Sequence, residues 1–453
     1  MIRKTLFAAT LAVLSASAMA AVSPDEAAQL GKTLTPVGAE KAGNKDGTIP
    51  EWTGGLTTIP AGFKAGDSVR PDPFAGEKPR LVITGQNADQ YKDKLNAVTY
   101  ALLKRYPTMR VDVYPTHRPV TYPAKILENT AKNALQAKTA DAGVSMENAL
   151  PGYPFPIPKT GNEVMWNHLM RYNGIATQCK YDAYNVDSSG TATLSTTGIA
   201  YQEWPTVTPA NIDRVIKPTD PFWNIKIEYL GPARRAGEAL LVIDHVNPLA
   251  QPRKAWQYLP GQRRVKLAPD IAYDTPNPGV AGSLTYDDSF VFSGAMDRFD
   301  FKLVGKKEMF VPYNSYKTNY PPLTRELVTK PNHFNPDLLR WEQHRMWVVE
   351  ATLKPGKRHI YSKRVFYCDE DSWVCLLSDQ YDARGQLYRG VLAATAFNYD
   401  VKAMGISFQM GYDLIAGIYA PQGICGLYYG IKQRDPFPAR DWQPDALAGA
   451  GIR

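Results

Sequence analysis

Residues 358–397 decide the fold, and they read RHIYSKRVFYCDEDSWVCLLSDQYDARGQLYRGVLAATAF. Three runs in this segment carry strand-forming residues, and two turns separate them. One turn falls at the Asp371–Ser372 step. The other runs from Asp382 to Gly385 and has the Asp and Gly that a type I turn favours at its first and fourth positions. The segment therefore predicts an antiparallel meander with strands at 358–367, 374–381 and 386–397.

The strand pattern extends on both sides of this meander. Pro260 and Gly261, a pair suited to a type II turn, separate two short strand patterns, and residues 293–295 separate two more. We expect these strands to form one antiparallel sheet of about ten or eleven strands. A sheet of that size must close, split or curl around a covering element. Its further strands are expected at 253–259, 263–267, 286–292, 299–304, 345–353, 407–418 and 426–432.

Helical patterns are few and come mostly early in the chain. Tyr91, Leu95, Val98 and Leu102 form one apolar stripe of a helix expected over 88–106. The predicted fold class is α+β, with a large curved antiparallel sheet that helices cover. Residues 21–220 are expected to form a Pro- and Gly-rich wrapping and helical region, continuous in one domain with the sheet of 221–453. Further helices are expected at 123–140, 162–172 and 336–342.

The first twenty residues have the order of a secretory signal peptide. Arg3 and Lys4 precede an apolar run at 6–14, and small residues lead to a cleavage site after Ala20. The apolar run is too short to cross a hydrocarbon core of ~30 Å. We therefore expect residues 1–20 to be removed and the mature protein to reach the periplasm.

The charge distribution argues against a nucleic-acid partner. The formal net charge is +8, but lysines and arginines are spread along the chain without a basic block. Nucleic-acid binding would predict a basic patch or stripe. The positive excess is either an ordinary solvated surface or a preference for anionic lipid headgroups.

The four cysteines predict two disulfides. Their even number fits an oxidising compartment, although sequence alone allows three connectivities. Cys368 and Cys375 fall opposite each other if the hairpin folds at residues 371–372, at a spacing close to what a disulfide needs. Cys179 and Cys425 would then form the second bond. A metal site is the competing interpretation, but the sequence lacks a Cys-x-x-Cys pair and a His cluster of ligand spacing.

Sequence motifs for catalysis are missing. The sequence has no Gly-x-Ser-x-Gly elbow, no phosphate-binding glycine loop and no His-Glu-x-x-His pair. Asp369, Glu370 and Asp371 could supply acid–base chemistry, but three acids at a hairpin tip are more typical of a solvated turn. We therefore expect a protein that is not an enzyme and that holds no cofactor or metal.

Large aromatic residues recur on the expected strands, several of them at the period of two that places them on one face. Two interpretations remain open for these rings. They either form an ordinary core against the covering helices or line a ligand cavity on a concave sheet face. The candidate cavity residues are Trp256, Tyr258, Phe290, Phe292, Phe299, Phe301, Trp347 and Phe366.

Residues 34–56, 363–373 and 381–387 resemble domain-of-unknown-function family 1329, a family of exported proteobacterial proteins. That family is in turn similar to periplasmic outer-membrane lipoprotein-sorting carriers of the LolA/LolB type. The resemblance implies an open antiparallel half-barrel capped by helices around an apolar cavity. It also implies a carrier for a lipid or other hydrophobic molecule that works with an RND-type exporter and an outer-membrane protein. The family has no established catalytic residues to transfer.

Two other functions remain open at this point. An envelope assembly or scaffold protein would fill the cavity with its own side chains, and an envelope hydrolase would need a nucleophile and a base that converge in a cleft. If the protein is a carrier, we expect an acyl chain inside the half-barrel and the helix at 88–106 as its lid.

Overall fold

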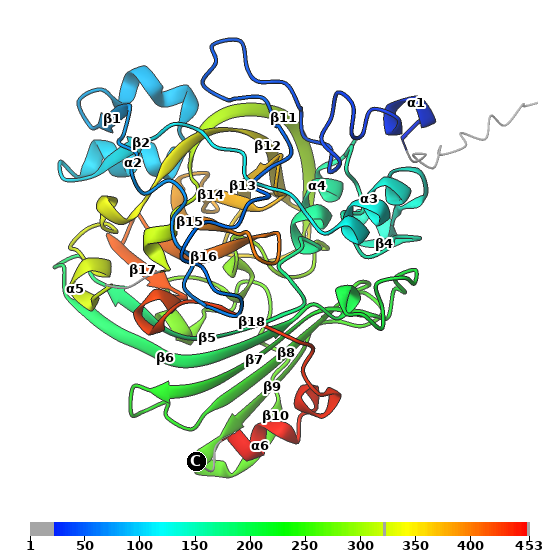
Figure 1. Ribbon diagram of the computed structural model, residues 1–453. Helices are drawn as coiled ribbons and strands as arrows, with labels where there is room; N and C mark the ends of the chain where they lie inside the picture. The colour runs from blue at the N-terminus through cyan, green and yellow to red at the C-terminus, as the bar shows by residue number, and fades with distance from the viewer. Residues whose placement is uncertain (1–21, 320–322, 451–453) are drawn as a thin grey trace, which may run out of the picture.

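The computed structural model describes residues 22–319 and 323–450, so the expected signal peptide at 1–20 lies outside the described residues. Strands dominate, and they form a strongly curved sheet with short helices at its margins (Figure 1). Within the described ranges, no helix has both the length and the apolar character that a membrane crossing requires.

The predicted meander is confirmed. Its strands β13, β14 and β15 pair antiparallel in sequence order, and β12 and β11 extend the sheet on the side of β13. Cys368 faces Cys375 across the hairpin, and Leu377 faces Leu392 on the next pair of strands. The bounds are β11 Phe299–Pro312, β12 Trp341–Leu353, β13 Lys363–Asp369, β14 Cys375–Tyr381 and β15 Leu387–Asn398.

A second group of strands continues the same sheet beyond the meander. Tyr419 in β17 pairs with Val186 in β5, and β18 pairs with the other end of β5. Strands β5 to β10 then follow one another antiparallel. The bounds are β5 Ala176–Val186, β6 Ala192–Glu203, β7 Pro221–Gly231, β8 Ala239–His245, β9 Lys254–Leu259, β10 Arg264–Leu267, β16 Ala403–Asp413, β17 Ile418–Gln422 and β18 Lys432–Arg434.

The sheet is larger than expected, with 16 strands among the described residues. It stays open, because its order begins at β1 (Leu81–Thr84) and ends at β10. One parallel contact, Val113 in β2 (Arg110–Val113) with Trp341, interrupts the antiparallel pattern. Strands β1, β2, β5 and β6 come from the part of the chain before residue 221. Polar residues interrupt both β5 and β6, with threonine the most frequent in β6, so the apolar alternation is weak there.

The prediction of a strand at 286–292 is wrong. Residues Tyr286–Asp288 form a 3₁₀ turn, and Phe290 and Val291 have positive φ angles of 54° and 71°. The side chain of Asp288 accepts hydrogen bonds from the backbone N–H and hydroxyl of Thr285. These bonds fold the chain back on itself, which prevents an extended conformation.

The last expected strand pair is also placed differently. Asp413 accepts hydrogen bonds from the N–H groups of Ile415 and Ala416, and this turn ends β16 and leads into β17. Residues Cys425–Tyr428 form a 3₁₀ turn where a strand was expected, and only β18 follows it.

Helices cover limited parts of the sheet. The expected helix at 88–106 is split into a 3₁₀ segment, Ala88–Lys94, and α2, because Asn96 caps α2 by accepting from the N–H of Thr99. Helix α4 packs on β11 and β12, α2 on β14 and β15, and α6 on β8, β9 and β10.

A 3₁₀ turn at Pro336–Leu338 replaces the helix expected at 336–342. The helices are α1 Pro24–Ala27, α2 Ala97–Arg105, α3 Ala124–Gln136, α4 Gly161–Leu169, α5 Arg325–Val328 and α6 Ala446–Ala450, and β3 (Lys138–Ala140) pairs with β4 (Ser145–Glu147).

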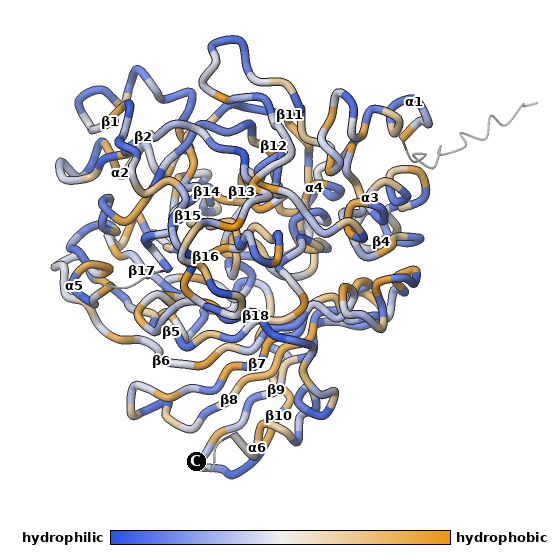
Figure 2. The backbone as a smooth tube through the Cα atoms, viewed as in Figure 1, coloured by the Kyte–Doolittle hydropathy of each residue, from blue (hydrophilic) through white to orange (hydrophobic). Residues whose placement is uncertain are grey.

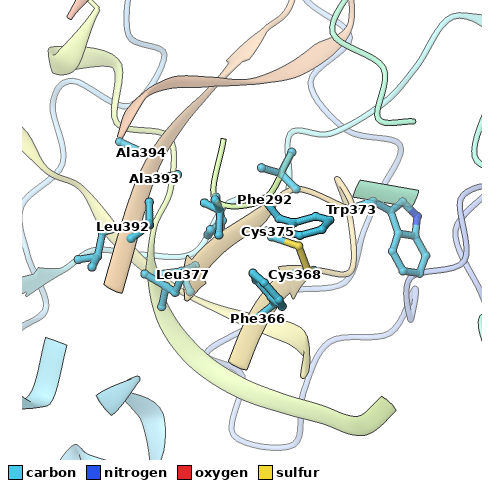
Figure 3. Packing of buried hydrophobic residues seen from close by; sticks show 14 of the residues in the cluster. Phe292, Phe366, Cys368, Trp373, Cys375, Leu377, Leu392, Ala393 and Ala394 are labelled. Carbon is cyan, nitrogen blue, oxygen red and sulfur yellow. A yellow bond between two sulfur atoms is a disulfide. The ribbon is translucent and has the colours of Figure 1, made fainter. Parts of the chain in front are cut away.

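The main core lies around the meander. Figure 3 shows the Cys368–Cys375 disulfide between Phe366 and Phe292, with Leu377 and Leu392 beyond it. All of these residues are buried. Apolar stretches also run along β7 and β8 (Figure 2). Side chains of these two strands contribute to the wall of the cavity described next.

Candidate ligand-binding cavity

A cavity of about 160 Å³ lies against one face of the second strand group. Its wall is formed by residues that alternate along β5, β6, β7 and β8, so their side chains point to the same face. Isoleucine, valine, leucine and aromatic side chains make up most of this wall. The wall residues are Tyr181, Ala183, Ala200, Gln202, Trp223, Ile225, Ile227, Tyr229, Leu240 and Val242.

The opposite side of the cavity comes from two distant segments. One is the irregular segment 277–293, between β10 and β11, and the other is residues 406–409 of β16. Phe290 contacts the strand wall directly, because its ring centre lies 5.7 Å from that of Trp223 in an edge-to-face arrangement. The cavity therefore lies between the curved sheet and a segment with little regular structure.

A buried charge network holds this segment in place. Arg364 donates to the carboxylates of Asp287 and Asp288 at 2.9 and 2.8 Å, and His359 lies 3.0 Å from Asp287. Although burial opposes ionisation, Arg364 and His359 hold the pKa of Asp287 well below its usual range. Tyr361 donates to Asp288 at 2.8 Å. The network anchors the base of segment 277–293 to β13.

The charged group in the cavity lining is already neutralised. Arg253 is the one ionisable cation among the lining residues, and its Nε and Nη2 donate to Asp244 at 2.7 and 2.6 Å. Nη2 also donates to Ser293 at 2.9 Å, and the Trp223 indole donates to Gln202 at 3.1 Å. The lining therefore suits an apolar guest better than a polar one.

Both predicted disulfides are confirmed, and one of them belongs to the cavity. Cys179 on β5 and Cys425 both line the cavity and are bonded to each other across 246 residues of sequence. The Cα atoms of this pair are 5.9 Å apart. This bond ties the strand wall to the segment that follows β17.

The predicted cavity residues separate into four groups, of which one reaches the cavity. Phe290 lines it. Trp256 and Tyr258 pair with Leu241 and Ala239 and lie on the opposite sheet face, in a cluster with Trp442. Trp347 stacks on Trp373, with ring centres 6.1 Å apart. The remaining four, Phe292, Phe299, Phe301 and Phe366, pack on one another in the main core.

The residues that do form the wall were missed by sequence reasoning. The signal was present in β7, where Trp223, Ile225, Ile227 and Tyr229 follow one another at a period of two.

The segment that was expected to act as a lid, residues 88–106, does not cover this cavity. Helix α2 packs on β14 and β15, and no residue of 88–106 lies in the cavity lining.

The acidic hairpin tip is buried, which corrects the expectation of a solvated turn. Arg118 binds Asp371 through Nε at 2.8 Å and Nη2 at 2.7 Å, and Lys306 donates to Glu370 at 2.7 Å. Arg345 donates to the other oxygen of Glu370 at 3.1 Å. These cations come from distant parts of the chain, and together they allow the acids to be buried.

The same cluster contains the one arrangement of possible metal ligands among the described residues. His344, Asp369 and Asp371 each offer a ligand atom, and these atoms lie within 4.8 Å of one another. Arg118, however, occupies both carboxylate oxygens of Asp371. A metal ion would therefore have to displace an existing ion pair.

The chain belongs to the family described as protein of unknown function (DUF1329), whose model matches residues 82–448. This confirms the family that the sequence resemblance implied. A protein of Pseudomonas aeruginosa described as uncharacterized is 42% identical over 448 residues, which cover 98% of this chain and 97% of that protein.

Several solved structures are similar to this chain at low sequence identity. A putative outer membrane lipoprotein-sorting protein domain from Vibrio parahaemolyticus has a TM-score of 0.44 and 14% identity, over 64% of this chain and 98% of that one. A DUF1329 family protein from Desulfovibrio piger has a TM-score of 0.41 and 14% identity, over 63% and 97%. A LolA superfamily protein from Nitrosomonas europaea has a TM-score of 0.38 and 12% identity, over 64% and 100%.

Proposed function

We propose that the protein binds and carries a lipid or other hydrophobic molecule in the periplasm. The observation that supports this proposal is the cavity between β5–β8 and segment 277–293, whose wall is largely apolar. Its volume of about 160 Å³ is similar to the ~150 Å³ of a dry apolar cavity that binds benzene. An acyl chain needs more room than that, so its uptake requires segment 277–293 to move outward.

The energy of such binding would come from apolar burial. Each buried CH₂ group contributes about 0.8 kcal/mol, so a chain of several methylenes is held without a covalent bond. Release then requires a movement that opens the cavity. Segment 277–293 is the candidate because it forms one wall and contains no β-strand or α-helix, while Arg364 keeps its residues Asp287 and Asp288 anchored to β13.

The periplasmic location in this proposal rests on two independent features. One is the order of residues 1–20, which is that of a secretory signal peptide. The other is the pair of disulfides, which persist in oxidising compartments such as the bacterial periplasm. An RND-type exporter and an outer-membrane protein remain the proposed partners, on the basis of the sequence resemblance.

Binding can be tested with a fatty acid that carries a fluorophore. The variant Ile225→Trp puts a larger ring into the cavity wall, where Ile225 is buried. The matched control is Leu230→Trp, on the same strand at an exposed position outside the lining. We expect the cavity variant to lose at least about tenfold in affinity, which corresponds to about 1.4 kcal/mol, and the control to bind like wild type.

A scaffold protein is the second candidate, because the resting cavity is small and the rings of the main core are fully packed. It predicts no binding of the fluorescent fatty acid by wild type, and no difference between the two tryptophan variants. An envelope hydrolase would instead be detected by turnover of ester substrates by the wild-type protein.

A further inference from the structure

Arg171 is a buried cation with no counter-ion among the described residues. It follows helix α4 and is only 7% exposed. Its Nη1 donates to the carbonyl of His168 at 2.6 Å, but its Nε has no hydrogen-bond partner. Buried arginines are almost always paired, because removing the charge from water is costly.

The surroundings of Arg171 do not supply a negative charge. Burial lowers the pKa of its guanidinium to about 10, which leaves it charged at neutral pH. The neighbouring Tyr153 stays neutral there, because burial raises the pKa of its hydroxyl well above the usual range. Arg171 also lowers the pKa of His168, which desolvation has already lowered, so that imidazole adds no charge. Each of the other buried arginines among the described residues forms a salt bridge.

Phe290 connects this cation to the cavity. The guanidinium carbon of Arg171 lies 5.4 Å from the centre of the Phe290 ring, within the range of a cation–π contact. The same ring lines the cavity and contacts Trp223. The Phe290 ring therefore contacts both Arg171 and the interior of the cavity.

The backbone at Phe290 is in a conformation that bulky residues rarely adopt. Phe290 and the β-branched Val291 both have φ in the left-handed region, and such strain is found at sites that change conformation. His168 holds the strained segment, since its Nδ1 accepts from the N–H of Cys375 and its Nε2 can therefore donate to the carbonyl of Phe290 at 3.0 Å. The Phe290 ring that contacts Arg171 is thus attached to a segment that stores conformational energy.

We propose that Arg171 binds the anionic headgroup of an amphiphilic ligand whose apolar part occupies the cavity, after Phe290 has turned aside. This inference rests on the proposed function and adds the ligand class, an acidic amphiphile. Arg171 also helps to end α4 through its bond to the His168 carbonyl, as a cation at a helix C-terminus does. That role uses Nη1 and explains neither the unpaired Nε nor the missing counter-ion.

The test compares ligands that share one apolar chain. Palmitic acid, pentadecyl phosphate and the uncharged methyl palmitate are each used to displace the fluorescent fatty acid. We expect wild type to bind at least one of the two anions about tenfold or more tightly than the ester, because hydrogen bonds to a charged group are the stronger ones. The anion that binds more tightly shows whether the site prefers a carboxylate or a phosphate headgroup.

Two arginine variants then assign the preference to a residue. Arg171→Gln is expected to bind the ester as wild type does and to lose the preference for the anion, whereas Arg171→Lys keeps part of it. The matched control is Arg235→Gln. Arg235 is also buried and lies 3.8 Å from the ring centre of the cavity residue Tyr229, but it is paired with Glu238. The control should keep the full preference.

The outcomes separate this inference from the proposed function. Equal affinity of wild type for the ester and both anions would overturn the role of Arg171 and leave hydrophobic binding intact. The same conclusion follows if Arg171→Gln keeps the preference. Failure of all three ligands to bind would overturn both. Should Arg171→Gln not fold, the wild-type comparison and the partial preference of Arg171→Lys still decide the question.

Discussion

The Nδ1 atom of His344 lies 3.8 Å from Oδ1 of Asp369, and this carboxylate oxygen is buried without a hydrogen-bond partner. The other oxygen of Asp369 accepts bonds from Tyr313 at 2.9 Å and from the hydroxyl of Ser372 at 2.5 Å. Burial, and then the charge of Asp371, raise the pKa of Asp369 to about 6. We therefore expect the proton to bind at this unpaired oxygen when Asp369 is protonated.

This raised pKa makes a prediction for stability. A folded-state pKa above the unfolded value of ~3.9 means that the folded protein holds the proton of Asp369 more tightly than the unfolded chain does. The stabilisation of the folded state by this proton is therefore complete below pH ~4 and is lost as pH rises through ~6. The variant Asp369→Asn should match wild type near pH 4 and exceed its unfolding free energy by up to about 3 kcal/mol near pH 8. Urea unfolding at both pH values checks this. A difference between the two proteins that does not vary with pH would contradict the assignment.

Arg118 is expected to be essential for folding stability. Its removal in Arg118→Ala leaves the buried Asp371 unpaired, which should cost about 3–5 kcal/mol. The control is Lys104→Ala, which breaks an exposed pair with Asp89 and should cost about 1 kcal/mol or less. Chemical denaturation of both variants gives the comparison. Similar losses of unfolding free energy in the two variants would show that the buried network contributes little to stability.

The two disulfides should contribute unequally. Cys179–Cys425 closes 246 residues of chain and Cys368–Cys375 closes seven, so the chain-entropy model predicts about 5 and about 2 kcal/mol. We expect Cys179→Ala/Cys425→Ala to lower the melting temperature more than Cys368→Ala/Cys375→Ala. The reverse order would mean that packing of the hairpin disulfide in the core outweighs loop length.

Phe290 and Phe292 are two residues apart and should respond differently to truncation. Phe292 is fully buried against Phe366 and Phe301, so Phe292→Ala should cost about 3–5 kcal/mol and leave ligand preference unchanged. Phe290→Ala enlarges the cavity and uncovers Arg171. It should therefore lose less unfolding free energy than Phe292→Ala and bind palmitic acid more tightly than wild type does. The measurements are urea unfolding and probe displacement. Weaker binding by Phe290→Ala would show that the ring holds the ligand rather than blocking it.

Local sequence information was sufficient for the meander and for the pairing of Cys368 with Cys375. Both depend on turns whose residues lie within a few positions of one another. The wall strands β5 and β6 were missed because their cavity-facing positions include small and polar residues, such as Ala183, Ala200 and Gln202, and so do not form a clear apolar pattern. The strained turn at Phe290 depends on partners more than 100 residues away. The carbonyl of Phe290 accepts a hydrogen bond from His168, and the N–H of Val291 donates one to Gln409.

Burial of the acidic hairpin tip could not be read from its own sequence for the same reason. Asp369, Glu370 and Asp371 have the composition of a solvated turn. Arg118 lies 253 residues before Asp371, and its two hydrogen bonds make burial of that carboxylate possible. Pairings at such separation depend on the completed fold, which places the Arg118 segment beside the hairpin.

The most direct test of the carrier proposal is native mass spectrometry of the mature protein purified from the periplasm. The proposal predicts a bound species with the mass of a lipid or an acyl-chain molecule, which lipid extraction removes and palmitic acid restores. It also predicts that Ile225→Trp prevents the reloading and that Leu230→Trp permits it. A protein that has only its own mass, both as purified and after incubation with palmitic acid, would contradict the proposal.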